Sequence, residues 1–458
     1  MTYREAVRYL LALGHELAAP RQARVHKFDL ENIRSLTQAL GQPHRRYPSA
    51  HIAGTNGKGS TAAFLDSILR AAGLATGLYT SPHLERINER IRVGGQPVPD
   101  EEFARSFTRV RQLIERLLAT GELAAHPTYF ECLTAMAFEV FARRPVDFAV
   151  LEVGMGGRLD ATNVIKPEVA IITSIDFDHE SYLGHSIEEI AAEKAGIIKP
   201  GIPVVSAAER AAARAVIVRR AEELAAPVVE ADRAYRLEAV RSEGGSYRAV
   251  AVEVESGERI ELAPSLEGRY QLRNALAAAA AARLLARRGF PLTRAAIERG
   301  IAQTSWAARL ERMGERPALY LDGSHNPAGA RELVAFWSEQ FPGRRLLLVY
   351  GAMRDKAVDE ITGVLFPRAD RVIFTAPHQP RAISAEALAA MSGHLARQFE
   401  VIAEPAAAVS RALDLAGPDD VVFVTGSLYL AGDLRPFLLE LTERGVRLAA
   451  APGRAPGP

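Results

Sequence analysis

The stretch HIAGTNGKGST, residues His51–Thr61, decides how the chain is organised. Its glycines permit a backbone loop whose N–H groups turn inward, and Lys58 adds a positive charge. The helix expected to follow presents its positive N-terminal end, so the loop is expected to bind phosphate. It is not the standard P-loop, whose spacing would place a glycine where Ile52 stands. An ordinary glycine-rich turn is the alternative, and Lys58 with the hydroxyls at the helix start argues against it.

Composition sets the broad class of protein. The 458 residues exceed one common domain, so we expect two or three. Lys and Arg number 56 and Asp and Glu 55, and this balance indicates no nucleic-acid partner. The single cysteine, Cys132, excludes an intramolecular disulfide and is expected to be buried and inert. The N-terminus lacks the apolar region of a secretory signal. No apolar run reaches the roughly 18 residues needed to cross a bilayer. We therefore expect a soluble, cytoplasmic protein with no membrane partner.

The alternation of apolar runs with helical patterns predicts an α/β protein with a mostly parallel sheet. Strands are expected at 49–53, 77–80, 146–153, 169–175, 318–322, 345–350, 371–375 and 421–425, and helices at 30–40, 102–118, 129–143, 274–288 and 292–301. Residues 235–240 and 247–254 alternate in polarity around the turn 243–246, which predicts a small antiparallel insert.

A fresh set of strand and helix units begins after about residue 302, which predicts a second domain. We expect a P-loop-type, mostly parallel sheet domain with the antiparallel insert over 1–301 and a hinge over 302–309. A smaller Rossmann-like α/β domain is expected over 310–450, followed by a disordered tail over 451–458.

Polar side chains follow two apolar runs, where an open α/β sheet places its ligands. Glu152 ends one run, and Asp176, Asp178 and His179 follow the other. A carboxylate, an imidazole and a hydroxyl near a triphosphate can hold Mg²⁺. A salt-bridged Glu152 and a loop histidine at 179 are the alternatives. Their place on the sheet edge that carries the phosphate loop favours a metal site.

The loop Gly54–Ser60 resembles the nucleotide loop of the Mur ligase superfamily, and the run LEVGMGGRLDATN, residues Leu151–Asn163, is similar to the signature of folylpolyglutamate and dihydrofolate synthases. Members are ATP-dependent ligases that form amides, and the matching motifs extend from about 49 to 430. The resemblance implies ATP as co-substrate, bound by Thr55, Asn56, Gly57, Lys58, Gly59 and Ser60. It also implies two Mg²⁺ ions, with ligands at Ser81, Glu152 and His179.

The same resemblance assigns residues further along the chain. In Ala192–Pro200 it implies that Lys194 is carbamylated, whereas a solvated helix lysine is the simpler alternative. Arg309 would clamp the γ-phosphate, although Ala307-Ala308 replaces the usual Pro-Gly before it.

Three more residues are implied as nucleotide contacts: Asn274, Asp322 and His325. Asn274 could instead, or also, cap the alanine-rich helix. It lies in a stretch where Tyr270 replaces the family's histidine.

Two segments match those that bind the pterin substrate in bifunctional members. They contribute Thr128, Tyr129, Phe130, Leu159, Asp160 and Ala161. Aromatic rings can stack on a flat heterocycle and Asp160 can pair with ring N–H groups, whereas core packing is the alternative for the two aromatics.

Elsewhere the match is weaker. Asp176-Phe177 stands where the family usually has a glycine and an aliphatic residue, which adds a carboxylate near the expected metal. The stretch Gly14–Phe28 differs from the family's usual substrate loop. Residues 424–430 resemble a block that faces the incoming amino acid.

The resemblance therefore implies a monomeric ligase that adds L-glutamate to dihydropteroate, to reduced folates or to both through an acyl phosphate. Catalysis would use Lys58, Lys194, His179 and Arg309. A folylpolyglutamate synthase alone is one alternative, and a peptidoglycan-type Mur ligase is another, against which Leu159–Asn163 argues. A nucleotide-binding module without catalysis is disfavoured because Glu152, His179 and Lys194 stand at the family positions.

Overall fold

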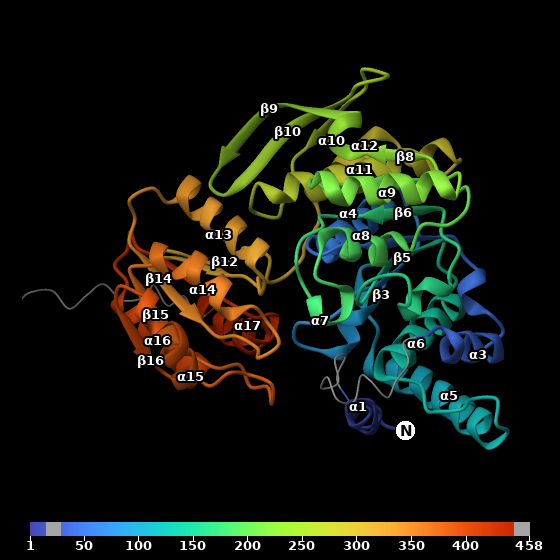
Figure 1. The fold of residues 1–458 in the computed structure, drawn as a ribbon, viewed down its shortest axis with the longest axis horizontal. Coiled ribbons are helices and arrows are strands. Elements are labelled where there is room, and N and C mark those ends of the chain that lie inside the picture. Colours follow the sequence, from blue (N-terminus) through green and yellow to red (C-terminus); the bar gives the residue numbers. More distant parts are fainter. Residues whose placement is uncertain (15–28, 444–458) are drawn as a thin grey trace, which may run out of the picture.

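The computed structural model describes residues 1–14 and 29–443. They form two lobes, each built on a mostly parallel sheet with helices on both faces (Figure 1). The stretch Gly14–Phe28, which differs from the family's usual substrate loop, lies outside the described residues apart from Gly14, and so does the predicted tail at 451–458.

The larger sheet has the strand order β4-β3-β2-β5-β1-β6-β7-β8. Its strands are β1 (Ser49–Ala53), β2 (Thr76–Tyr79), β3 (Ile91–Val93), β4 (Gln96–Pro97), β5 (Phe148–Glu152), β6 (Val169–Ile172), β7 (Val204–Ser206) and β8 (Val228–Glu230). Only β3 and β4 run antiparallel to their neighbours. Every residue of β1 is buried because the strand is central and covered on both faces, which explains its unbroken run of small and apolar residues.

Side chains of the central strands alternate between two apolar layers. Val169 and Ile171 of β6 face the layer of α4 (Lys58–Ala71), α11 (Tyr270–Arg287) and α12 (Arg294–Ala302). Ala170 and Ile172 face the opposite layer. Helices of that opposite layer are α1 (Tyr3–Ala12), α3 (Glu31–Ala39), α5 (Asp100–Ala119), α6 (Tyr129–Arg143), α7 (Glu180–Leu183), α8 (Ile187–Ala195) and α9 (Ala211–Glu223).

The antiparallel insert is confirmed and gains one strand. It is a sheet of β9 (Tyr235–Glu243), β10 (Ser246–Glu253) and β11 (Arg259–Leu262), joined to β8 by the short helix α10 (Ala231–Ala234). β11 has only four residues, too few for its alternation to stand out in the sequence. In Figure 1 the β9–β10 hairpin reaches above α13 (Pro327–Gln340) of the other lobe.

The second sheet has the order β12-β13-β17-β14-β15-β16, with all pairs parallel except β12 with β13. Its strands are β12 (Glu311–Glu315), β13 (Ala318–Leu321), β14 (Leu346–Tyr350), β15 (Arg371–Phe374), β16 (Phe399–Val401) and β17 (Val421–Thr425). Its helices are α13 (Pro327–Gln340), α14 (Val358–Leu365), α15 (Ala385–Ser392), α16 (Pro405–Leu415) and α17 (Leu428–Glu443). The mixed α/β second lobe was predicted, whereas the short edge strands β12 and β16 were not.

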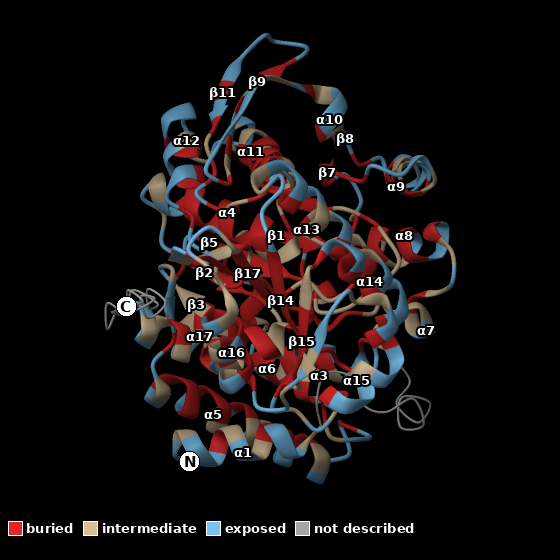
Figure 2. Ribbon diagram, turned by 90° about the vertical axis from the view of Figure 1, so that its left-hand side faces the viewer, coloured by how far each residue is buried: buried red, intermediate tan, exposed pale blue. Residues whose placement is uncertain are grey.

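Residues between α12 and β12 form no helix or strand, and this connection contains the predicted hinge at 302–309. The exact domain limits stay a prediction. Buried residues concentrate in the strands of both sheets, among them β1, β14 and β17 (Figure 2). Cys132 is buried as expected, and burial raises the pKa of its thiol. Across the described ranges 1–14 and 29–443, the helices are too short or too polar to span a membrane.

The crossing of α12 over α4 depends on Gly300. A Cβ at this position would collide with the backbone of Ile68. We therefore expect Gly300→Ala to push the helices apart and lower the free energy of unfolding by about 1–3 kcal/mol, measured by urea denaturation. Gly363→Ala is the matched control, since no atom lies within 4 Å of a Cβ placed there in α14. Alanine should leave that helix as stable or more stable, and equal losses in both variants would contradict the close crossing.

Candidate active site

The strand order gathers the predicted site residues at one edge of the larger sheet. β1 leads into the phosphate loop, while β5 and β6 flank it in parallel, with Glu152 opposite Ile52 in register. Ser81 follows β2, the strand beyond β5, and His179 follows β6. Because carboxyl ends of parallel strands share an edge, these side chains from distant parts of the sequence lie around the loop.

The loop is held tightly against its neighbours. Gly54 and Gly57 have φ of +153° and +85°, and a Cβ on either would collide, with Thr173 and with Asn274 respectively. Gly57 precedes α4, so Gly59 and Ser60 lie in the first turn, where backbone N–H groups are free to bind an anion. Ser60 is buried and accepts a hydrogen bond from Gln271 at 3.4 Å.

Two lysines converge on one carbonyl of the loop. Lys58 Nζ donates to Gly54 O at 3.0 Å and to Thr55 O at 3.1 Å, and Lys194 Nζ donates to Gly54 O at 2.9 Å. Burial lowers the pKa of Lys58, partly offset by the carboxylates of Glu152 and Asp178. Burial and then the Lys58 charge lower the pKa of Lys194 to about 7. Two buried cations side by side favour an anion at this position.

The expected magnesium ligands fit that ion chemically. Glu152 is 4% exposed and accepts a hydrogen bond from the Ser81 backbone N–H at 3.0 Å, so these two residues are in contact. Burial and then the Lys356 charge lower the pKa of His179 to about 3, which leaves its imidazole neutral near pH 7. Mg²⁺ accepts one or two carboxylates together with substrate phosphates and water. In the described ranges no three His, Cys, Asp or Glu side chains could hold a metal by themselves, so phosphate and water would complete the shell.

Side chains from the second lobe reach the same loop. The amides of Asn56 and Asn326 exchange hydrogen bonds of 3.1 and 2.8 Å, and Asn326 also donates to Asp178 at 3.3 Å. Lys356 Nζ lies 3.0 Å from Asp178 Oδ1. Although burial alone would raise the pKa of the Asp178 carboxyl, the Lys356 ammonium holds it well below its usual range. The lobes therefore meet beside the loop through charged and amide groups.

The predicted nucleotide contacts of the second lobe surround the connection between the lobes. Asp322 accepts hydrogen bonds from Leu310 N and Ser324 N, both at 2.8 Å, which fixes the connection to the β13 loop. His325 is held by Gly323 O at 2.8 Å, and burial followed by the Lys356 charge lowers its pKa to about 4.

Arg309 and Asn274 come from different parts of the chain, and the Arg309 charge and the Asn274 amide both act on the loop. Arg309 donates to Ala308 O at 3.0 Å and approaches Gly323. Asn274 packs on Gly57 and donates to Gln271 at 2.9 Å. The alternative role of Asn274 as a helix cap is wrong, because α11 already begins at Tyr270. Its amide instead faces the phosphate loop.

The predicted pterin contacts fall into two groups. Thr128 caps α6, Tyr129 is buried under the Arg90 guanidinium at 5.4 Å, and Phe130 packs against Gly154 and against Tyr79 at 5.9 Å between rings. The other group is Leu159, Asp160 and Ala161, of which Leu159 alone is not buried.

Asp160 is engaged inside the protein. Its carboxylate accepts hydrogen bonds from the backbone N–H groups of Gly154, Met155 and Thr162 at 3.0, 3.1 and 3.0 Å, and from the Thr162 hydroxyl at 2.5 Å. These four donors use the acceptor sites of a carboxylate, which favours a role in shaping the loop.

Sequence reasoning missed Lys356 and Asn326. Lys356 ends a loop that begins directly after the buried strand β14, and such a position at the carboxyl edge could have drawn attention. Asn326 caps α13, since its side chain accepts a hydrogen bond from Gly329 N at 2.9 Å. Nothing in the sequence indicated its second bond across the cleft.

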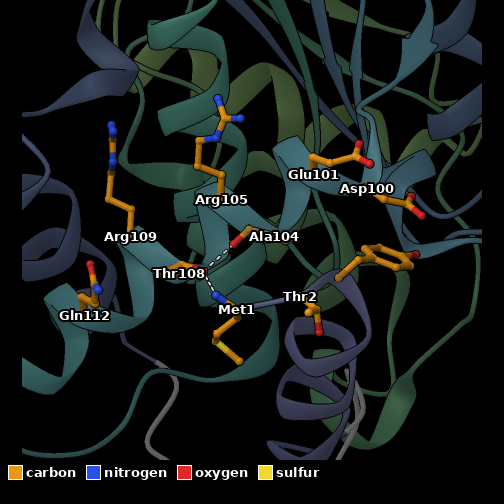
Figure 3. A pocket seen from close by; sticks show the side chains of 10 residues that line it. Met1, Thr2, Asp100, Glu101, Ala104, Arg105, Thr108, Arg109 and Gln112 are labelled. Carbon is orange, nitrogen blue, oxygen red and sulfur yellow. Dashed lines mark hydrogen bonds between the residues drawn. The ribbon is translucent and has the colours of Figure 1, made fainter.

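A separate hollow of about 670 Å³ lies between α1 and α5, away from the loop (Figure 3). Met1, Arg105, Arg109, Asp100 and Glu101 line it together with neutral side chains, so cations and carboxylates are mixed. It contains none of the predicted site residues.

Comparison with known proteins identifies the class. Residues 52–282 match the Mur ligase middle domain, and residues 308–428 match the Mur ligase glutamate ligase domain. The two matches correspond to the two lobes, each with its own sheet. Fold and site therefore define an ATP-dependent ligase that forms amide bonds.

Similar proteins identify the family within this class of ligases. The chain is 37% identical over 411 residues to dihydrofolate synthase/folylpolyglutamate synthase of Bacillus subtilis, covering 89% of this chain and 94% of that protein. A solved Mycobacterium tuberculosis folylpolyglutamate synthase with ADP has a TM-score of 0.86 at 33% identity, over 95% and 98% of the two chains. A folylpolyglutamate synthase (FPGS) complex with AMPPCP and folate has a TM-score of 0.80 at 34% identity, over 96% and 100%. The chain belongs to the folylpolyglutamate synthase and dihydrofolate synthase family of Mur ligases.

Replacement of Lys58 by methionine is expected to reduce ATP-dependent ligation by about 10²–10³-fold or more, because a positioned cation would be lost from the phosphate site. Thermal unfolding should stay cooperative, since methionine fills a similar volume. The measurement is release of phosphate dependent on the amino acid. Lys166→Met is the control, since Lys166 is exposed. Retained turnover in Lys58→Met would refute the role of the loop.

The hydrogen bonds of Asp160 predict a loss of stability on substitution. Asp160→Ala leaves three backbone donors unpaired and should lower the free energy of unfolding by about 1–3 kcal/mol, measured by urea denaturation without ligand. A residue that only contacted substrate would change binding and leave the unfolding midpoint where it was.

Proposed function

We propose that this enzyme joins L-glutamate to the carboxylate of dihydropteroate and, in further rounds, to reduced folates, with conversion of ATP to ADP and phosphate. One observation supports this best: Lys58 and Lys194 share the Gly54 carbonyl of the loop, where Lys58 would meet a polyphosphate. The name of the Bacillus subtilis relative carries both activities, and the FPGS complex contains an ATP analogue with folate. A bifunctional enzyme is therefore the preferred proposal over a folylpolyglutamate synthase alone.

ATP would bind with its phosphates on the loop Thr55–Ser60 and on the N-terminus of α4. Ser81, Glu152 and His179 would hold Mg²⁺ beside the phosphates, and we propose two such ions for each bound ATP. Bound magnesium would neutralise charge on the phosphate oxygens. Asn274 would contact the nucleotide from α11, and Asp322 and His325 would approach it from the second lobe.

The reaction proceeds in two displacements. An oxygen of the folate or pteroate carboxylate attacks the γ-phosphorus, the bond to the β-phosphate oxygen breaks and ADP leaves. The glutamate amine, having lost a proton, then attacks the acyl carbon and expels phosphate, which leaves the amide. No protein nucleophile is required, so Lys58 and Arg309 act by positioning and by balancing negative charge.

Arg309 would clamp the γ-phosphate. The segment around it has left-handed backbone at Ala308 (φ 53°) and Leu310 (φ 47°), which bends the connection despite the absence of Pro-Gly. The guanidinium donates to the neighbouring Ala308 carbonyl and could exchange that bond for phosphate oxygens.

The pterin ring would lie between α6 and the loop after β5. Tyr129 and Phe130 come from the start of α6, and Phe130 approaches Gly154 closely. Leu159 and Ala161 would form the other wall, and Asp160 would hold that wall in shape in addition to any contact with the ring. Thr128 fixes the start of the helix by capping it.

We further propose that Lys194 is carbamylated. It is 4% exposed, and burial leaves about half of its amine neutral near pH 7 when its pKa is about 7. The neutral amine is the form that adds CO₂. The product is an anion, which would relieve the repulsion between Lys194 and Lys58.

Substitutions at Lys194 separate the two charge states. Lys194→Glu should retain more ligation than Lys194→Arg, because a carbamate is negative, and added acetate should partly restore Lys194→Ala. Initial rates of phosphate release at saturating ATP are the measurement. If the arginine variant is the more active and acetate has no effect, the lysine works as an ammonium group.

The substrates are tested directly with purified protein, ATP and labelled glutamate. Amide formation with dihydropteroate and with tetrahydrofolate is expected, whereas product from tetrahydrofolate alone would favour folylpolyglutamate synthase activity only. Phosphate release with UDP-linked muramyl substrates and none with pteroate compounds would overturn the proposal. Light scattering tests the proposed monomer.

A further inference from the structure

Asp176 connects the two lobes through a single carboxylate. Its Oδ1 accepts a hydrogen bond from Arg210 at 2.7 Å, and its Oδ2 accepts one from Arg331 at 2.8 Å. Arg210 precedes α9 of the larger lobe, whereas Arg331 belongs to α13 of the second lobe. The carboxylate is therefore the middle of an arginine–aspartate–arginine bridge.

The backbone of Asp176 is bound to the phosphate loop. The Thr55 hydroxyl donates to Asp176 O at 2.9 Å, and Asp176 N donates back to the same hydroxyl at 3.1 Å. The carboxylate is further fixed because Oδ1 accepts from Phe177 N at 2.9 Å. Because the carboxylate and these backbone groups belong to one residue, a movement of the carboxylate would also shift the groups that bind Thr55.

Phe177 and Arg210 complete the bridge. The Arg210 guanidinium lies 5.6 Å from the centre of the Phe177 ring, so one arginine contacts both residues of the Asp176-Phe177 pair. The carboxylate adjacent to the expected metal site is consequently turned toward arginines and does not act as an additional metal ligand.

We propose that Asp176 is a positioning residue that couples the approach of the second lobe to the phosphate loop. Arg331 binds the carboxylate only when α13 lies against the larger lobe, and the bonds to Thr55 then hold the loop in one geometry. The bridge adds to the Asn56–Asn326 and Asp178–Lys356 contacts in the cleft. Only the kinetic test of this inference rests on the proposed ligase function.

The predicted effect is moderate because the bridge is partly exposed. The side chains of Arg331 and Asp176 are 50% and 16% exposed. Asp176→Asn and Arg331→Gln should each lower kcat/KM for glutamate about two- to fivefold, the size expected for a partly exposed ion pair. The dissociation constant of an ATP analogue should change by less than about twofold, because the Thr55 bonds use the backbone of Asp176.

A double-mutant cycle tests the bridge. The Asp176→Asn/Arg331→Gln variant should be no worse than Asp176→Asn alone, since that substitution already removes the ion pair with Arg331. Arg220→Gln, which breaks a surface pair with Glu223 inside one helix, is the matched control and should match the unsubstituted protein. Additive losses, or ligation equal to that of the control, would overturn the coupling.

A second measurement does not depend on turnover. Small-angle scattering with the ATP analogue should show a larger radius of gyration for Arg331→Gln than for the unsubstituted protein and the Arg220→Gln control. If the unsubstituted protein does not ligate glutamate, the proposed function is wrong. The comparison of radii still tests whether Asp176 and Arg331 hold the two lobes together. Equal radii in all three proteins would refute it.

Discussion

The site depends on two buried lysines that share one carbonyl. Lys58 and Lys194 both donate to Gly54 O, and the Lys58 charge lowers the pKa of Lys194 further than burial alone. Two buried positive charges this close repel one another strongly, and the repulsion is relieved by a polyphosphate on the loop or by a carbamate on Lys194. The loop, the sheet edge and the second lobe are arranged around these two side chains.

Parallel strands make the arrangement possible without long loops. Because β5 and β6 flank β1, Glu152 and His179 reach the phosphate loop from adjacent strand ends although many residues separate them in the chain. The alternation of β6 side chains between two apolar layers fixes the register, since a one-residue slip would move Ile171 into the layer that Ala170 and Ile172 occupy. The same packing that stabilises the sheet therefore positions the acidic and imidazole groups.

Local signals in the sequence predicted local structure well. β1 and α6 begin and end at the predicted residues, because an apolar run before a glycine loop and a Thr128 cap mark these limits clearly. Short edge strands such as β12 and β16 were missed, since few residues face the core and tertiary pairing decides their conformation. Asn326 and Lys356 were missed for a related reason. Their partners, Asn56 and Asp178, lie in the other lobe, and a local sequence pattern does not indicate a contact between lobes.

Several contacts between the lobes are polar, which matters for a ligase that must release its product. Amide pairs and partly exposed ion pairs such as Asp176–Arg331 each contribute about 0.2–1.5 kcal/mol in water, so several can form on closure and still separate quickly. An apolar interface of the same area would hold the lobes together far more firmly. Asp176 fits this logic, because its two arginines come from different lobes and its backbone belongs to the loop region. A weak ion pair at that position can couple closure of the lobes to the geometry of the phosphate loop. It does not prevent the lobes from opening again.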